Sequence, residues 1–178
     1  YLKGKGVLFS KNDVVLYQDN KKIPFKAKNI VIATGSAPTS LPGVEIDEKN
    51  IISSTGALSL TALPKKLIVI GGGYIGLEMG SVWSRLGSQV IVLEYLNHIT
   101  PGMDKEISKE FQKILTKQGI NFKLNSKVLS VKTKSGITEV EFEDNMTSKK
   151  EKIVADKVLV SVGRKPYTEG LNLSKIGI

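Results

Sequence analysis

Three glycines near the middle of the chain have the spacing of a phosphate-binding turn. Gly71, Gly73 and Gly76, in the segment GGGYIG, form the pattern G-x-G-x-x-G. In that pattern the first glycine makes a tight turn, the second lets a pyrophosphate approach the backbone, and the third lets a helix pack closely on a strand. The unpaired N–H groups and positive dipole end of the helix then face the phosphates. Because glycine also serves ordinary turns, the pattern needs support from its surroundings.

The carboxylate of Glu94 provides part of that support. Glu94 ends an apolar segment about 20 residues after the glycines, where a dinucleotide-binding unit places the acid that binds the adenine ribose. Its charge would repel the 2′-phosphate that distinguishes NADP(H) from NAD(H). The residues that follow, Tyr95, Leu96 and Asn97, include no arginine to neutralise such a phosphate. The sequence therefore predicts a dinucleotide site that favours NAD(H).

Two further titratable residues lie near this motif. We expect Glu78 in the first turn of the helix, where local chemistry leaves open whether it only suits the helix dipole or contacts the ligand. His98, the only histidine, has no partner nearby in sequence, and we expect it to be exposed. Because the chain has no cysteine, it contains no redox dithiol, and its single histidine lies in no pattern typical of a Ser-His-Asp triad or a metal site.

The composition fits an ordinary globular protein. Its 178 residues are 40% hydrophobic and 24% charged, which excludes a disulfide scaffold, a collagen and a low-complexity chain. The net charge is +9, but the basic residues are scattered lysines apart from Arg85 and Arg164, and only 6% of residues are aromatic. This pattern indicates a solvated surface rather than a nucleic-acid site.

The apolar segment Leu67–Leu77 is shorter than the roughly 20 residues of a membrane span, so we expect a soluble protein. Because the chain starts at Tyr1 without a leader pattern, we expect it to be part of a longer protein.

The elements around the glycines predict a strand–helix–strand unit. Leu67–Ile70 and Gln89–Leu93 are continuous apolar runs typical of strands buried on both faces of a parallel sheet. Between them, Gly87 closes a helical pattern whose expected buried stripe is Ile75, Met79, Val82, Trp83 and Leu86.

A second helix is expected between Asp104 and Gln118, followed by a strand over residues 120–124. Its apolar positions are Ile107, Phe111, Ile114 and Leu115, and Gly119 supplies the stop.

The two ends of the chain have strand patterns of other kinds. At the start, Val7–Phe9 and Val14–Tyr17 predict an antiparallel ribbon, and Ile30–Ile32 predicts a buried strand before a loop over Thr34–Pro42. From Val128 onward, residues alternate as in an antiparallel meander, and we expect Thr138, Val140 and Phe142 to point inward. Strand residues follow again at Ile153–Val154, and the last apolar strand is expected at Val158–Val162. The fold class is therefore α/β: a Rossmann-like fold with a parallel sheet, helices and an antiparallel β-meander.

Four segments resemble the dihydrolipoyl dehydrogenases, the E3 components of 2-oxo acid dehydrogenase complexes within the pyridine nucleotide-disulfide oxidoreductase family. They are VIATGSAPTSLPG at 31–43, ISSTGALSL at 52–60, LIVIGGGYIGLEMGSVWSRLGSQVIVLE at 67–94 and VLVSVGRKPYTEGLNLSKIGI at 158–178. The resemblance implies that the Rossmann-like fold is an FAD/NAD(P)-binding fold. It also implies that residues 1–36 are the C-terminal part of an FAD-binding domain, that 37–166 are the NAD-binding domain, and that 167–178 begin the return to the FAD and central domains.

The resemblance also implies where cofactors bind. By motif, FAD would contact Gly6, Thr34, Gly35 and Ser36. The resemblance implies that Glu78 has a functional role near the nicotinamide and flavin. It also implies that Val128 lies beside the adenine and Gly163 near the nicotinamide. The residues implied to bind NAD are Gly71, Gly72, Gly73, Tyr74, Ile75, Gly76, Leu77, Glu78, Glu94, Val128 and Gly163.

The activity implied by the resemblance is oxidation of protein-bound dihydrolipoamide to lipoamide through a redox disulfide and FAD, with hydride passed to NAD⁺. The catalytic cysteine pair and the His-Glu base would lie outside this chain, so we expect it to be inactive alone. The implied partners are NAD(H), lipoyl domains of a 2-oxo acid dehydrogenase complex and a second copy in a homodimer, with no nucleic acid or membrane. The implied location is the cytoplasm, or the mitochondrial matrix in a eukaryote. The alternatives are another flavoprotein disulfide reductase, an NADH oxidase, and a non-catalytic NAD(H)-binding module.

Overall fold

The computed structural model describes every residue from Tyr1 to Ile178. The chain forms two units: unit 1 consists of Tyr1–Ala37 and Lys165–Ile178, and unit 2 of Pro38–Arg164. Strands β4 (Ser36–Pro38) and β13 (Arg164–Pro166) pair with each other where the chain passes between the units. Part of the loop expected over Thr34–Pro42 is therefore a short strand.

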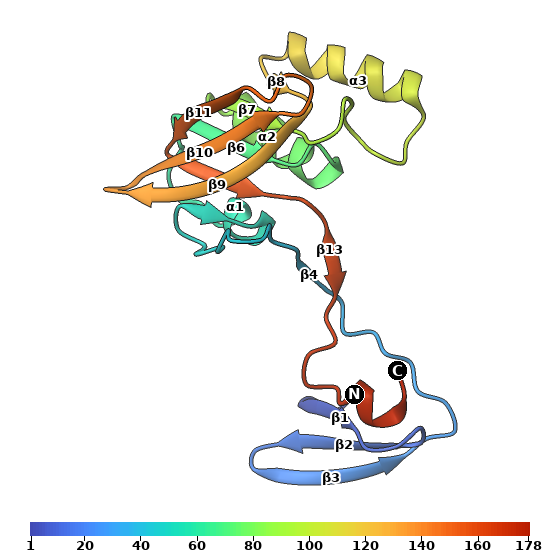
Figure 1. Ribbon diagram of the computed structural model, residues 1–178. Helices are drawn as coiled ribbons and strands as arrows, with labels where there is room; N and C mark the ends of the chain where they lie inside the picture. Colours follow the sequence, from blue (N-terminus) through green and yellow to red (C-terminus); the bar gives the residue numbers. More distant parts are fainter. The chain divides into compact units, whose positions relative to one another are not determined.

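Unit 1 contains the expected antiparallel ribbon (Figure 1). Strands β1 (Lys5–Leu8), β2 (Asp13–Gln18) and β3 (Lys21–Lys26) pair in sequence order. The tight β2–β3 turn requires positive φ at Asp19 and Asn20, residue types that tolerate this conformation. The sequence did not predict β3, which contains Pro24; an edge strand tolerates proline because one side of it has no partner strand. A short 3₁₀ helix, Leu173–Ile176, lies near the end of the unit.

The strand expected at Ile30–Ile32 is not formed. These residues have no strand pairing, and Val31 is 87% exposed. A strand of a parallel sheet needs neighbouring strands on its edges, and the three strands of unit 1 pair only with one another. Residues 30–32 therefore have the apolar composition of a buried strand, but no strand of this chain pairs with them.

Unit 2 is built on a five-stranded parallel sheet in the order β5-β12-β6-β7-β8. Strands β6 (Lys66–Ile70), β7 (Gln89–Leu93) and β8 (Asn121–Lys123) confirm the three central predictions. Strand β12 (Lys157–Val160) ends two residues before the expected Val162, and β5 (Ile51–Ile52) was not foreseen.

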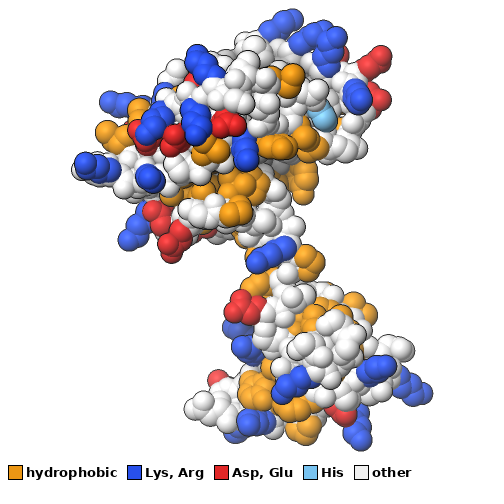
Figure 2. Space-filling view, in the orientation of Figure 1, with side chains coloured by type: hydrophobic (Ala, Val, Ile, Leu, Met, Phe, Trp, Pro, Cys, Tyr) orange, Lys and Arg blue, Asp and Glu red, His pale blue; other side chains and the backbone are white.

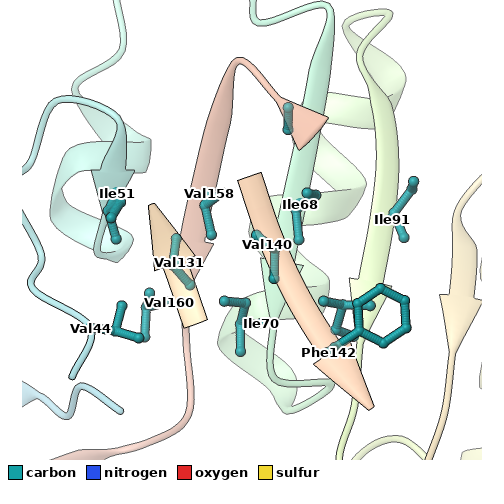
Figure 3. Close-up of a cluster of buried hydrophobic side chains, with 12 residues drawn as sticks. Val44, Ile51, Ile68, Ile70, Ile91, Val131, Val140, Phe142, Val158 and Val160 are labelled. Atoms are coloured by element: carbon teal, nitrogen blue, oxygen red, sulfur yellow. The ribbon is translucent and has the colours of Figure 1, made fainter. Parts of the chain in front are cut away.

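An antiparallel sheet covers one face of this parallel sheet. It contains β9 (Ser126–Lys134), β10 (Ile137–Asp144) and β11 (Lys150–Ala155), with β10 in the middle, as the alternation predicted. Val140 and Phe142 of β10 lie over Ile68, Ile70 and Ile91 of the parallel sheet (Figure 3). The outer side of the meander is polar, with ion pairs such as Lys152–Glu139.

Helices cover the other face. They are α1 (Ser54–Leu58), α2 (Tyr74–Arg85) and α3 (Lys105–Lys117). Residues of β6 alternate between the two layers: Leu67 and Val69 belong to the helix-side core, and Ile68 and Ile70 to the meander-side core. The sequence did not predict α1.

The buried side of α2 differs from the predicted stripe. Gly76, Leu77, Gly80 and Trp83 are buried, whereas Val82 and Leu86 are 49% and 58% exposed. Glycines on the inner face bring the helix axis close to the sheet, and an apolar stripe counted from side chains does not register them. The prediction of the buried face of α2 was therefore wrong in part: Trp83 is buried as expected, but the rest of that face is formed by Gly76, Leu77 and Gly80.

Helix α3 has the expected bounds, with the side chain of Asp104 capping its N-terminus. Its buried residues, however, are only Ser108 and Leu115; Ile107 and Ile114 are more than half exposed, and Phe111 is 37% exposed. The Ser108 hydroxyl lies 2.8 Å from the hydroxyl of Thr100. The prediction is therefore confirmed for Leu115, which packs in the helix-side core, while the rest of the contact comes from the polar Ser108 and not from an apolar stripe.

Lys and Arg side chains are spread over both units on the visible face, with acidic side chains among them (Figure 2). No helix has the length and hydropathy of a membrane span. The structure brings together no group of three His, Cys, Asp or Glu residues that could hold a metal ion.

Candidate functional site

The glycine turn begins at the carboxyl end of β6. Gly71 has φ of +105°, a conformation that side chains rarely adopt, and its N–H donates to the carbonyl of Leu93 at 2.9 Å. A Cβ at this position would lie 2.5 Å from the carbonyl oxygen of Ser161. Both backbone conformation and space therefore require glycine here.

Gly73 is the N-cap of α2, and its surroundings are open. A Cβ at Gly73 would meet no atom within 4 Å, although the residue lines a cavity. The first hydrogen bond of the helix runs from Leu77 N–H to the Gly73 carbonyl at 3.1 Å. The preceding N–H groups of the helix start thus have no helical carbonyl to bind and are available to an anion.

Gly76 lies at the contact between α2 and the sheet. A Cβ there would clash with the carbonyl of Gly71, and would lie 2.5 Å from the Ser161 hydroxyl and 3.0 Å from Val69. This is the close helix–strand packing that the pattern predicts for its third glycine.

Glu94 follows β7 and is buried, with 7% of its surface exposed. Its Oε2 accepts the N–H of Gly72 at 2.5 Å, and its Oε1 accepts the N–H of Leu96 at 2.8 Å. A carboxylate offers about four acceptor positions, so further donors can bind where Glu94 lines the cavity. The carboxylate is thus held in one position beside the glycine turn.

A network of hydrogen bonds fixes the backbone around Glu94. The Glu94 N–H donates to Lys123 and its carbonyl accepts from Ser126, at 3.0 and 2.7 Å. The Leu96 carbonyl accepts from the Asn125 N–H at 2.9 Å. Four segments therefore meet at this corner: the glycine turn, the end of β7, β8 and the start of β9.

The turn between β10 and β11 joins the same corner. The side-chain amide of Asn145 donates to the Tyr95 carbonyl at 3.0 Å, and the Asn145 N–H donates to the Asn125 carbonyl at 2.7 Å. Hydrogen bonds from the N–H groups of Thr147 and Met146 hold the pKa of Asp144 below its ordinary value. An ionised Asp144 therefore stabilises the turn that carries Asn145.

A cavity of about 740 Å³ lies within unit 2, along the glycine turn and the carboxyl ends of the parallel strands. Open α/β sheets bind ligands at this edge, and the volume lies within the range of small-molecule and cofactor sites. Its lining comes from the turn, the end of β7, residues 100–103, β9, the end of β12 and a loop at Leu41–Pro42.

The cavity brings together seven of the eleven residues predicted for NAD. These are Gly71, Gly73, Tyr74, Ile75, Glu94, Val128 and Gly163. Of the other four, Gly72 binds Glu94 through its N–H, while Gly76 and Leu77 are buried between helix and sheet. Glu78 is exposed and lies beyond the first turn of α2, which contains no acidic residue. The expectation of a first-turn acid was wrong because the helix starts at Tyr74, within the glycine segment.

The four residues predicted for FAD lie in unit 1 and are not among the residues that line the cavity of unit 2. Gly6 pairs with Leu16 in the ribbon. The Thr34 hydroxyl donates to the Tyr167 carbonyl at 2.5 Å, the Tyr167 N–H donates to the Gly35 carbonyl at 2.9 Å, and Ser36 begins β4.

His98 is partly buried rather than exposed. Its Nδ1 lies 2.8 Å from the side-chain oxygen of Asn97, its neighbour in sequence. The prediction that it has no nearby partner was therefore wrong.

Sequence reasoning missed several cavity residues, among them Ser161, Tyr95, Lys127 and Leu129. The Ser161 hydroxyl donates to the carbonyls of Ile70 and Gly71, at 3.0 and 3.2 Å. It can do so because β12 pairs with β6, a neighbour about 90 residues earlier in the chain. Local spacing carries no signal of that pairing, although Tyr95 could have been found as the residue after the predicted ribose-binding acid.

The residues present fit a dinucleotide. The chain offers an open backbone at Gly73, unpaired N–H groups at a helix start and a fixed carboxylate at Glu94, all at one cavity. These groups match a pyrophosphate and a ribose in the order in which a dinucleotide carries them.

Comparison with known proteins gives a consistent result. The family model described as pyridine nucleotide-disulphide oxidoreductase matches residues 1–178. A dihydrolipoamide dehydrogenase of Chaetomium thermophilum is 59% identical over the whole chain, and the mitochondrial dihydrolipoyl dehydrogenase of Pisum sativum is 52% identical over the whole chain. The chain spans 36% of the length of each of these relatives.

A solved structure shares the fold. The HOCl-induced flavoprotein disulfide reductase RclA of Escherichia coli matches 99% of the chain with a TM-score of 0.83 and 28% identity, and the match covers 39% of that protein.

Proposed function

Because the chain belongs to the pyridine nucleotide-disulphide oxidoreductase family, we propose that it is the NAD-binding part of a dihydrolipoyl dehydrogenase. Two relatives with this activity in their names are more than half identical to it along its whole length. Since the chain spans about a third of those relatives, the proposed activity is that of a longer protein.

We assign the NAD-binding domain to residues 37–166, close to the bounds of unit 2. Residues 1–36 are then the C-terminal part of the FAD-binding domain, and residues 167–178 begin the return to the FAD and central domains. That these two stretches contact each other in unit 1 supports the assignment.

The position of Glu94 carries the proposal for NAD. A dinucleotide whose pyrophosphate lies on the N–H groups at the start of α2 would place its adenine ribose against this carboxylate. Because Glu94 is buried and fixed by two N–H donors, it could not turn away from a 2′-phosphate. The site should therefore take NAD(H) and reject NADP(H).

Two lining segments are assigned to the two halves of the cofactor. Val128 belongs to β9, whose first residue, Ser126, is bonded to Glu94, and it is assigned to the adenine. Gly163 follows Ser161, whose hydroxyl binds the glycine turn, and it is assigned to the nicotinamide. Glu78, exposed on the second turn of α2, is assigned to the neighbourhood of the nicotinamide and flavin.

FAD would contact Gly6, Thr34, Gly35 and Ser36 together with residues outside this chain. In the whole protein FAD would supply the two-electron relay between a redox disulfide and NAD⁺. The substrate would be dihydrolipoamide on lipoyl domains of a 2-oxo acid dehydrogenase complex, oxidised to lipoamide. The protein would be a homodimer located in the cytoplasm, or in the mitochondrial matrix in a eukaryote.

The test uses the full-length protein purified with its flavin. Reduction of NAD⁺ by dihydrolipoamide is measured beside reduction of NADP⁺. The expected result is turnover with NAD⁺. The kcat/KM for NADP⁺ should be at least tenfold lower than the kcat/KM for NAD⁺, a difference of about 1.4 kcal/mol. No turnover with dihydrolipoamide would overturn the assigned substrate, and equal use of both nucleotides would overturn the role of Glu94.

A second candidate is another flavoprotein disulfide reductase, a reading supported by the likeness to RclA. An NADH oxidase is a variant of it. Oxygen consumption with NADH alone, or a single active-site cysteine in the full-length protein, would favour the oxidase. An NADH-binding protein without activity toward any dithiol, disulfide or oxygen would be a binding module.

A further inference from the structure

Tyr95 is an exposed aromatic side chain on the wall of the cavity. It is 60% exposed, and its hydroxyl makes no hydrogen bond in the structure. We propose that the ring of Tyr95 is the stacking surface for the purine base of the dinucleotide. This inference rests on the proposed function and adds a residue that contributes affinity for the adenosine half of the cofactor.

The backbone of Tyr95 is held from both sides. The Glu94 carbonyl is bound by Ser126, the Tyr95 carbonyl by Asn145 and the Leu96 carbonyl by Asn125. Three consecutive residues thus have their carbonyls bound by segments beyond β7. The side chain between these anchors starts from a fixed position, which lowers the entropy lost when a ring stacks on it.

The order of groups along a dinucleotide places the purine at this end. The pyrophosphate belongs at the start of α2, and the adjoining ribose belongs at Glu94. The base attached to that ribose then lies beyond Glu94, away from the glycine turn. Tyr95 is the next residue along the chain and lines the same cavity.

Apolar side chains of β9 complete this end of the cavity. Val128 and Leu129 line it, and the bond from Ser126 N–H to the Glu94 carbonyl joins the start of β9 to the end of β7. Leu129 is 37% exposed, so like Tyr95 it retains apolar surface for a ligand to cover. A flat heteroaromatic ring between an aromatic side chain and aliphatic side chains would bury apolar surface on both faces.

The effect of lost stacking can be distinguished from a general disturbance of the site. Base–aromatic stacking needs a ring but no hydroxyl, and it acts only on the half of the cofactor that carries the base. Replacing Tyr95 with Phe should therefore preserve it, and replacing Tyr95 with Ala should remove it. A nucleotide without the adenosine half should not respond to either change.

The experiment measures steady-state kinetics of the full-length flavoprotein with dihydrolipoamide. Probes are NAD⁺, nicotinamide mononucleotide as a substrate without adenosine, and ADP as an inhibitor competitive with NAD⁺. The variants are Tyr95→Ala and Tyr95→Phe. The control is Phe111→Ala, which removes an aromatic ring of similar size outside the cavity.

For Tyr95→Ala we expect the KM for NAD⁺ and the inhibition constant of ADP to rise together, by about tenfold. The kcat with NAD⁺ and the kcat/KM with nicotinamide mononucleotide should stay within twofold. Tyr95→Phe and Phe111→Ala should leave all of these constants within twofold.

Unchanged constants for Tyr95→Ala would overturn the stacking role while leaving the proposed activity intact. Equal losses with NAD⁺ and nicotinamide mononucleotide would also overturn it, because the damage would then lie outside the base. Failure of the proposed function would be seen separately, as absence of turnover in the unaltered protein.

Discussion

The carboxylate of Glu94 accepts the N–H of Gly72 at 2.5 Å and so joins the end of β7 to the turn that follows β6. The residue predicted to select the nucleotide is thus also a structural support of the phosphate turn. If Glu94 binds the ribose as proposed, binding and stability are coupled at this one side chain, and its variants must be measured for both.

Replacing Glu94 with Ala should weaken NADH binding by about 1–3 kcal/mol, because a charged acceptor for the ribose is lost. It should also lower the free energy of unfolding by about 1–3 kcal/mol, because the buried N–H of Gly72 loses its partner. Calorimetric titration and thermal unfolding measure the two effects. Glu139→Ala, which breaks an exposed ion pair with Lys152, is the control. Unchanged NADH affinity would mean that the carboxylate does not face the ribose.

Replacing Gly73 with Val should abolish most NADH binding while the fold persists. The new side chain enters open space, and the φ of −76° at this position suits any residue. Loss of the N-cap glycine costs about 1 kcal/mol or less. NADH titration beside a circular dichroism spectrum checks both parts. Normal affinity in this variant would show that no phosphate lies against Gly73.

Replacing Gly76 with Ala should destabilise unit 2 by about 1–3 kcal/mol, because the added methyl meets the Gly71 carbonyl and the Ser161 hydroxyl. Gly80→Ala is the matched control on the same helix face, since its methyl would lie 3.4 Å from Val90, an ordinary contact. Alanine also has the higher helix propensity, so the control should be neutral or stabilising. Urea unfolding, followed by fluorescence of Trp83, the only tryptophan, compares them. Equal stability of the two variants would contradict this account of the helix packing.

Replacing Asn145 with Ala should raise the KM for NAD⁺ several-fold, because the Tyr95 carbonyl loses its anchor. An exposed hydrogen bond contributes about 1 kcal/mol or less to stability, so the fold should be retained. Met146→Ala changes an exposed neighbour in the same turn and serves as the control. If both variants gave the wild-type KM, the turn would not contribute to the purine end.

The β10–β11 turn should loosen in acid. The folded pKa of Asp144 is lowered by hydrogen bonds from Thr147 and Met146, so its contribution to stability is present above the ordinary value of 3.8 and is lost as pH falls through the lowered pKa. Amide hydrogen exchange at Met146 and Thr147, corrected for intrinsic rates, should therefore accelerate below about pH 4. Asp144→Asn should exchange faster at pH 7 and show a weaker response to acid. A variant with the wild-type acid profile would remove Asp144 as the cause.

Several parts of this architecture could be predicted because their signals are local. β6 and β7 are continuous apolar runs, and α3 is bounded by Asp104 and Gly119. The signals that failed depend on neighbours. Val31 has strand composition, but no strand in this chain pairs with it.

The cavity wall was harder to predict than the turn itself. Ser161 and Lys127 reach the cavity through sheet order and through the packing of the meander. The inner face of α2 depends on Gly76 and Gly80, whose lack of side chains is what allows the close approach. A hydrophobicity pattern registers side chains that are present, so it could not find this face.

The pairing of β4 with β13 also bears on how such a molecule can be assembled over evolutionary time. The Thr39 N–H donates to the Gly163 carbonyl at 2.9 Å, and these are the second and the second-to-last residues of unit 2, so its two ends are adjacent. A guest segment whose own folding brings its ends together imposes on its host only the closure entropy of a short loop. Residues 38–164 therefore have the geometry of an inserted domain, which a host protein could gain or exchange without rearranging its own strands.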